Sequence, residues 1–146
     1  MNKIPATIHS WDGKICRVSI DGYTDGANVQ PQAEVCFPLG DKPAHTDFRL
    51  LKGDAVWVEF NNGNPNEPFV VGFRNKNTGT AKGYRRLHHD NIEMAADAQF
   101  NIAAAQTKIT APTTIIGDLI VQGNIRSTGN MKADGTMTDS DGNNGA

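Results

Sequence analysis

The sequence predicts an all-β protein, made of a small barrel followed by a repetitive, fibre-like section. Residues 4–74 alternate apolar and polar side chains in short runs between clusters of turn residues, which is typical of β-strands. Four glycines recur every six residues later in the chain: Gly117, Gly123, Gly129 and Gly135. Nine of the ten aromatic residues precede position 85, so only the first half has the side chains for a conventional core.

The first half is predicted to contain five strands, at residues 4–10, 15–20, 33–38, 55–60 and 69–73. The pair Asp12-Gly13 indicates a hairpin between the first two strands. A loop over 21–31, an irregular stretch over 40–48 and a polar connection over 61–68 separate the others. About five strands in about 70 residues, with no convincing helix, predict a Greek-key barrel of the OB type over residues 1–74.

The second half reads as a linker over 75–90, a fibrous section over 91–138 and a short polar tip over 139–146. Apolar residues occupy even positions from Ile92 to Ala104 and odd positions from Ile109 onward. Because a one-residue slip turns every side chain to the opposite face, we expect a bulge or turn between Ala105 and Lys108. An alanine-rich helix over 91–106 is the alternative.

Repetition at a fixed short period predicts a β-solenoid or an intertwined β-fibre. Short aliphatics and glycines can hardly offset the ordering entropy of a single chain, so this section is expected to need partner chains. If several chains wrap around one axis, glycines at regular intervals allow close backbone approach there. The residues predicted to face the axis are Ile109, Ile115, Gly117, Leu119, Val121, Gly123, Ile125, Gly129, Met131, Gly135 and Met137.

The charges do not predict a nucleic-acid partner, because the net charge is −2 and neither half is strongly basic. One basic stretch without an acid lies between residues 75 and 89; it is either a solvated linker or a contact for an acidic neighbouring subunit. Its basic residues are Lys76, Lys82, Arg85, Arg86, His88 and His89.

The two cysteines, Cys16 and Cys36, lie in predicted strands, so a cross-strand disulfide is geometrically possible. Reduced, buried thiols are the commoner finding in a chain without a secretion signal. The sequence shows no apolar leader and no run long enough for a transmembrane helix, so we expect a soluble protein made in a cytoplasm.

One stretch carries a recognisable motif, Gly-Asp-x-Val-x-Val-x-Phe, then a turn rich in Asn, Gly and Pro, then Pro-x-Val-x-Gly. Gly53 permits a turn into a strand, Val56 and Val58 share one face opposite Trp57, and Gly72 is expected to let the closing strand approach another backbone. The motif residues are Gly53, Asp54, Val56, Trp57, Val58, Phe60, Gly63, Pro65, Pro68, Val70 and Gly72.

This motif resembles the N-terminal OB domain of the baseplate spikes of contractile-tail phages and of the related type VI secretion spikes. In those proteins the barrel precedes a trimeric, intertwined β-helix, and the order here is similar over residues 4–138. The resemblance implies a homotrimer, with three chains around one axis. It also implies a structural virion protein at the tip of the tail baseplate, assembled in the host cytoplasm. It would dock on the tail hub and pierce the host outer membrane mechanically when the sheath contracts.

The sequence departs from the family at the apex, where many spikes bind iron through a His-x-His pair. The only paired histidines, His88 and His89, are adjacent and precede the fibrous section. Successive strand residues point to opposite faces, so they are poor ligands for one ion. We therefore expect no metal and no other cofactor, and either a blunt tip or a separate small tip protein.

Three other interpretations remain. A left-handed hexapeptide β-helix would place an aliphatic residue before each glycine, but the chain has Ile116, Gln122, Thr128 and Asp134 there. An OB-fold nucleic-acid or ligand-binding module with an oligomerisation tail could stack bases on Trp57 and Phe60, although Asp54 and Glu59 flank them.

An enzyme is the third interpretation. Ser10 or Ser19, His45 and Asp47 are triad residue types, but no nucleophile elbow, phosphate loop or metal-ligand spacing accompanies them. We therefore expect no catalysis and assign no catalytic residue.

Overall fold

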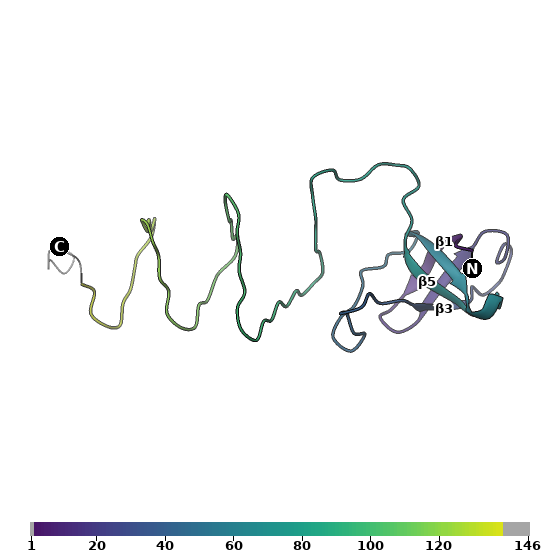
Figure 1. The fold of residues 1–146 in the computed structure, drawn as a ribbon, viewed down its shortest axis with the longest axis horizontal. Coiled ribbons are helices and arrows are strands. Elements are labelled where there is room, and N and C mark those ends of the chain that lie inside the picture. Colours follow the sequence, from purple (N-terminus) through teal and green to yellow (C-terminus); the bar gives the residue numbers. More distant parts are fainter. Residues whose placement is uncertain (1, 139–146) are drawn as a thin grey trace. The chain divides into compact units, whose positions relative to one another are not determined.

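The computed structural model describes residues 2–138, which are all-β and contain no α-helix. The strands are β1 (Ile4–Trp11), β2 (Cys16–Ile20), β3 (Gln32–Val35), β4 (Ala55–Phe60) and β5 (Pro68–Phe73), with one 3₁₀ turn, η1 (Asn61–Gly63). They form a closed barrel in the order β1-β2-β3-β5-β4 (Figure 1). Five strands were predicted close to these positions, and the closed barrel is consistent with the OB type. The predicted tip, residues 139–146, lies outside the described residues.

The barrel closes through β3. β1 pairs antiparallel with both β2 and β4, and β4 pairs antiparallel with β5. β3 is antiparallel to β2 but parallel to β5, and this parallel pairing joins the two ends of the sheet. β3 ends at Val35, before the predicted end at residue 38. A register shift between Ile8 and Ser10 leaves His9 as the extra residue of a bulge, which increases the local bend of β1.

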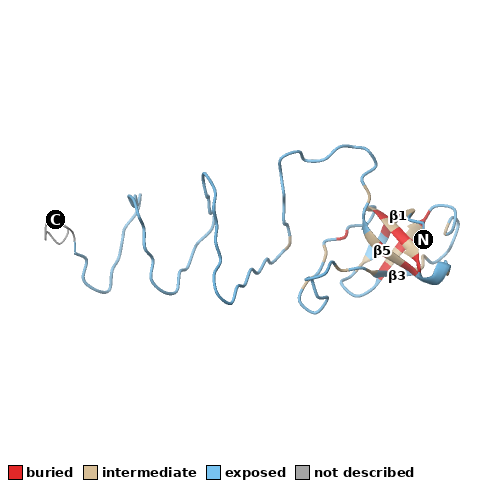
Figure 2. Ribbon diagram, in the orientation of Figure 1, coloured by how far each residue is buried: buried red, intermediate tan, exposed pale blue. Residues whose placement is uncertain are grey.

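The core consists of the inward residues of the strands. β2 and β4 alternate strictly between buried and half-buried positions, so the period-two pattern that predicted them also fills the barrel (Figure 2). Each fully buried aliphatic side chain contributes about 1.5–3 kcal/mol. The largest fully buried side chains are Ile8, Ile20, Val18, Val56, Val58 and Cys16.

The β1–β2 hairpin has the predicted Asp-Gly turn. Gly13 has a φ of +88°, and Asp12 Oδ1 accepts hydrogen bonds from the backbone N–H groups of Ile15 (2.6 Å) and Lys14 (2.8 Å). These bonds favour the ionised carboxyl, so the Ile15 amide first and then the Lys14 amide lower the pKa of Asp12.

The Gly-Asp pair of the motif attaches the start of β4 to β1. Gly53 has a φ of +91°, and its N–H donates to the Ile8 carbonyl (2.8 Å). The Ile8 N–H in turn donates to the Asp54 carbonyl (2.9 Å), and Asp54 Oδ2 accepts from the Leu51 N–H (2.8 Å). The predicted turn into the strand is therefore present, and it requires glycine because of its positive φ.

The predicted reason for Gly72 was wrong in this chain. A Cβ at Gly72 would meet no atom within 4 Å, so no close backbone approach requires glycine there. Gly72 instead has a φ of +156° and lies beside the register shift between β4 and β5. The backbone conformation at a bulge, rather than crowding, explains this glycine.

The described residues after Phe73 contain no helix and no paired strand, so the alanine-rich helix over 91–106 is not formed. The chain divides into two units, one ending at Ala98 and one beginning at Gln99. The first unit holds the barrel and also includes the segment that was predicted to be a linker.

Candidate assembly surface of the C-terminal unit

The second unit bends at regular intervals. Bends occur at residues 105, 111, 117, 122–123, 128–129 and 134–135, with extended chain between them (Figure 1). The period of six that the glycines predicted is therefore present in the backbone. It extends upstream to Ala105 and Ala111, which the glycine pattern could not reveal. Of the four repeated glycines, Gly117 (φ +123°) and Gly123 (φ +147°) have conformations that favour glycine, whereas Gly129 and Gly135 do not.

The apolar side chains of this unit are exposed (Figure 2). Odd-position aliphatics range from 45% exposed at Val121 to 68% at Ile109, whereas the even-position Ile116 and Ile120 are 97% and 85% exposed. From residue 109 onward, the odd-position row (the sheltered row) is thus less exposed than Ile116 and Ile120 (the open row), although all of these side chains are exposed. The sheltered row coincides with the positions predicted to face an axis: Ile109, Ile115, Leu119, Val121, Ile125, Met131 and Met137.

The described backbone of this unit also lacks backbone partners. Among the described residues after Tyr84, no backbone N–H donates to a backbone carbonyl. The polar contacts there are local, such as Ser127 Oγ donating to the Gly129 carbonyl (2.9 Å) and the Lys132–Asp134 ion pair (3.2 Å). Extended chain with free donors, free acceptors and an apolar row is the pattern that strand pairing with other chains would satisfy.

The four repeated glycines have open space around them. A Cβ at Gly117, Gly123, Gly129 or Gly135 would meet no atom within 4 Å. Crowding at an axis would have to come from other chains, so the predicted role of these glycines stays a prediction.

The motif residues lie where the barrel needs them. Val56, Val58 and Val70 point into the core, and Trp57 lies on the outer face with the Arg74 guanidinium 5.4 Å from its ring centroid. Phe60 is 7% exposed and packs edge-to-face against Tyr23 (5.1 Å). Phe60 is therefore not available as a base-stacking surface.

The 61–68 connection of the motif is held by hydrogen bonds. The Asn61 N–H and side-chain amide both donate to Glu67, at 2.9 Å each, and the Asn64 N–H donates to the Asn61 carbonyl (2.8 Å). Gly63 ends η1 with a φ of +78°, and Pro65 follows in the connection.

No hydrogen bond or ion pair among the described residues joins the triad residue types to one another. Asp47 Oδ1 accepts from the Trp11 indole N–H (3.2 Å), and its other oxygen lies 3.5 Å from His89 Nε2. No group of three potential metal ligands occurs among residues 2–138.

The cysteines are separate and free. Cys16 is buried in the core, and burial raises the pKa of its thiol. Cys36 is exposed, so the expectation of a buried thiol was wrong for it. The thiol is still partly desolvated by its surroundings, and this desolvation, followed by the negative charges of Glu34 and Glu59, raises the pKa of Cys36. It borders a cavity of about 510 Å³ that Glu34, Glu67 and Asn61 also line.

No family of known proteins matches the chain, and no curated protein resembles it in sequence. The described residues contain no helix that is long and apolar enough to cross a membrane.

Proposed function

We propose that this chain is the subunit of a homotrimeric spike, in which the barrels form a collar and three C-terminal sections wrap into an intertwined β-helix needle. The collar docks on the hub of a contractile tail. The needle is driven through the host outer membrane by sheath contraction, and its tip is either blunt or capped by a separate small protein.

One observation carries this proposal: residues 99–138 combine a regular bend, a sheltered apolar row and an unpaired backbone. A single chain gains nothing from that arrangement, whereas three intertwined chains bury the row and pair the backbone. Such a shaft has no free strand edge and is therefore narrow, rigid and protected from further association. The polar even positions, such as Gln122, Asn124 and Arg126, keep its surface soluble.

The barrel supports the same proposal by its position and by its motif. The Gly-Asp turn fastens β4 to β1, and the strands close without a free edge. A closed barrel that precedes a fibre-forming section in the sequence is a suitable rigid collar. Mechanical piercing needs rigidity and shape rather than a reactive group.

The first test is the mass of the full chain in solution, measured by light scattering after size exclusion. We expect a particle of about three times the 15.7 kDa chain mass that withstands detergent. A clean monomer at micromolar concentration would overturn the proposal.

The second test addresses the location. An antibody raised against the chain should label the tip of contractile-tail particles in electron micrographs. Labelling along the sheath, or no labelling of intact particles, would contradict the role as a spike. Fluorescence anisotropy with single-stranded DNA at low and high salt tests the alternative of a nucleic-acid-binding module, for which salt-dependent binding is the signature.

A further inference from the structure

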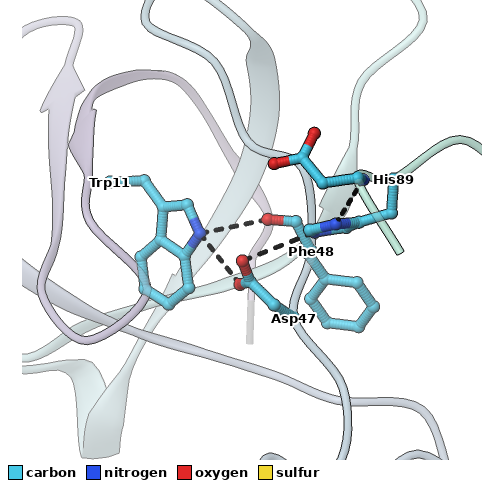
Figure 3. A network of polar contacts seen from close by, with 5 residues as sticks. Trp11, Asp47, Phe48 and His89 are labelled. Atoms are coloured by element: carbon cyan, nitrogen blue, oxygen red, sulfur yellow. Dashed lines mark hydrogen bonds and ion pairs between the residues drawn. The ribbon is translucent and has the colours of Figure 1, made fainter. Parts of the chain in front are cut away.

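The segment after β5 returns to the barrel instead of leaving it. His89 contacts Asp47 (Figure 3), and His88 contacts Arg49; Asp47 and Arg49 both lie on the loop between β3 and β4. These contacts lie within the first unit and join residues about 40 positions apart in sequence.

Asp47 links the end of β1 to His89. Its Oδ1 accepts from the Trp11 indole N–H (3.2 Å), which also donates to the Phe48 carbonyl (3.0 Å). Its Oδ2 lies 3.5 Å from His89 Nε2. His89 Nδ1 accepts the backbone N–H of Asp90 (2.9 Å), so in the neutral imidazole the proton lies on Nε2 and faces the carboxylate. His89 Nε2 is shielded from solvent and forms no hydrogen bond among the described residues.

The second contact lies two residues further along the same loop. Arg49 Nη1 is 3.0 Å from His88 Nε2. Between Asp47 and Arg49, the Phe48 ring stacks on Phe37 (centroids 4.5 Å apart) and packs against the core. Phe48 therefore anchors the loop, and the residue on either side of it holds one histidine.

We infer that Asp47, Arg49, His88 and His89 form a two-point clasp, which fastens residues 88–90 to the barrel. The chain is also fixed before this segment, because the Arg74 N–H donates to the Ala55 carbonyl (2.8 Å). Residues 75–87 are thus a loop closed at both ends rather than a free linker. That loop presents the four basic residues Lys76, Lys82, Arg85 and Arg86, all of them exposed.

The clasp has a mechanical consequence. A force transmitted between the C-terminal section and the barrel would reach the barrel at residues 47–49. It would not stretch the loop formed by residues 75–87. This consequence rests on the proposed function, whereas the clasp itself does not.

Hydrogen–deuterium exchange on the full chain, followed by mass spectrometry, tests the clasp. The readout is the amide of Asp90, which donates to His89 Nδ1 (2.9 Å) and is the one amide of residues 87–90 with a hydrogen-bond acceptor in the structure. The double variant Asp47→Asn/Arg49→Ala removes both loop partners and keeps His89 as that acceptor, and His45→Ala is the matched control because it removes an exposed histidine from the same β3–β4 loop. Losing two polar contacts should make the Asp90 amide exchange about tenfold faster. The control should leave its exchange unchanged.

A second variant, Asp47→Asn, keeps an oxygen for the Trp11 indole and removes the carboxylate that faces His89. It should accelerate the Asp90 amide while the strand amides of β1 and β4 stay protected. An Asp90 amide that already exchanges at the unprotected rate in the wild type, or that keeps its rate in both variants, would overturn the clasp. Light scattering on the same samples reports the trimer separately, so a failure of the clasp and a failure of the spike are distinguishable.

Discussion

Replacing Ile125 with aspartate should prevent assembly of three chains while leaving the barrel folded. Ile125 lies in the sheltered apolar row, two residues after the bend at Gly123, and is 65% exposed in the single chain. If three copies meet at an axis, the substitution removes three aliphatic side chains from that axis and places three carboxylates there.

The magnitude follows from the area that assembly would still bury. Complete burial of an isoleucine side chain is worth about 1.5–3 kcal/mol, so burying the exposed two thirds is worth about 1–2 kcal/mol per chain. Three copies therefore lose about 3–6 kcal/mol, which is roughly a 10²- to 10⁴-fold weaker assembly. Repulsion and desolvation of the carboxylates add to this loss.

The assay is light scattering over a range of concentrations, with near-ultraviolet circular dichroism of Trp11 and Trp57 reporting the fold of the barrel. Ile116→Asp is the matched control, because Ile116 is 97% exposed and belongs to the open row. It should leave the mass of the assembly unchanged. A trimer of wild-type stability in Ile125→Asp, or equal damage from Ile116→Asp, would refute the assignment of the two rows.

Three further outcomes are expected. Gly53→Ala should lower the free energy of unfolding of the barrel by about 1–2 kcal/mol in thermal denaturation, because its φ of +91° is costly for a residue with a Cβ; an unchanged melting temperature would contradict this. The hydrogen bonds from the Ile15 and Lys14 amides lower the pKa of Asp12. They therefore stabilise the folded state at pH values above the ordinary carboxyl pKa, and this stabilisation is lost as the pH falls through the lowered pKa of Asp12. Asp12→Ala should therefore flatten the stability profile below about pH 4, and a profile identical to wild type would argue against the turn. A thiol reagent should modify Cys36 in the native protein and Cys16 only after unfolding, as peptide mapping would show; equal rates would contradict the burial of Cys16.

The strands could be predicted because their burial is periodic. β2 and β4 bury every second residue, so hydrophobicity alone locates them. The end of β3 was placed too late, because Cys36 and Phe37 continue the apolar pattern while the chain has already left the ladder after Val35. Hydrophobicity reports burial, whereas a strand end depends on where the partner strand stops.

The candidate site was predictable in its period but not in its full extent. The glycines revealed a period of six residues. The chain also bends at Ala105 and Ala111, where no distinctive residue signals a bend. The clasp was not predictable at all, since His88 and His89 carry no local signal and meet their partners only because the chain turns back on the barrel.

The sequence by itself determined the all-β class, the positions of the strands and the division into an aromatic-rich half and a half of short side chains. These follow from local periodicity and composition, which act along the chain. The tertiary structure decided that β3 closes the barrel in parallel with β5, that Phe60 is buried beside Tyr23, and that residues 88–90 are fastened to the β3–β4 loop. Each of these depends on contacts between distant segments, whose free energy appears only when folding brings them together.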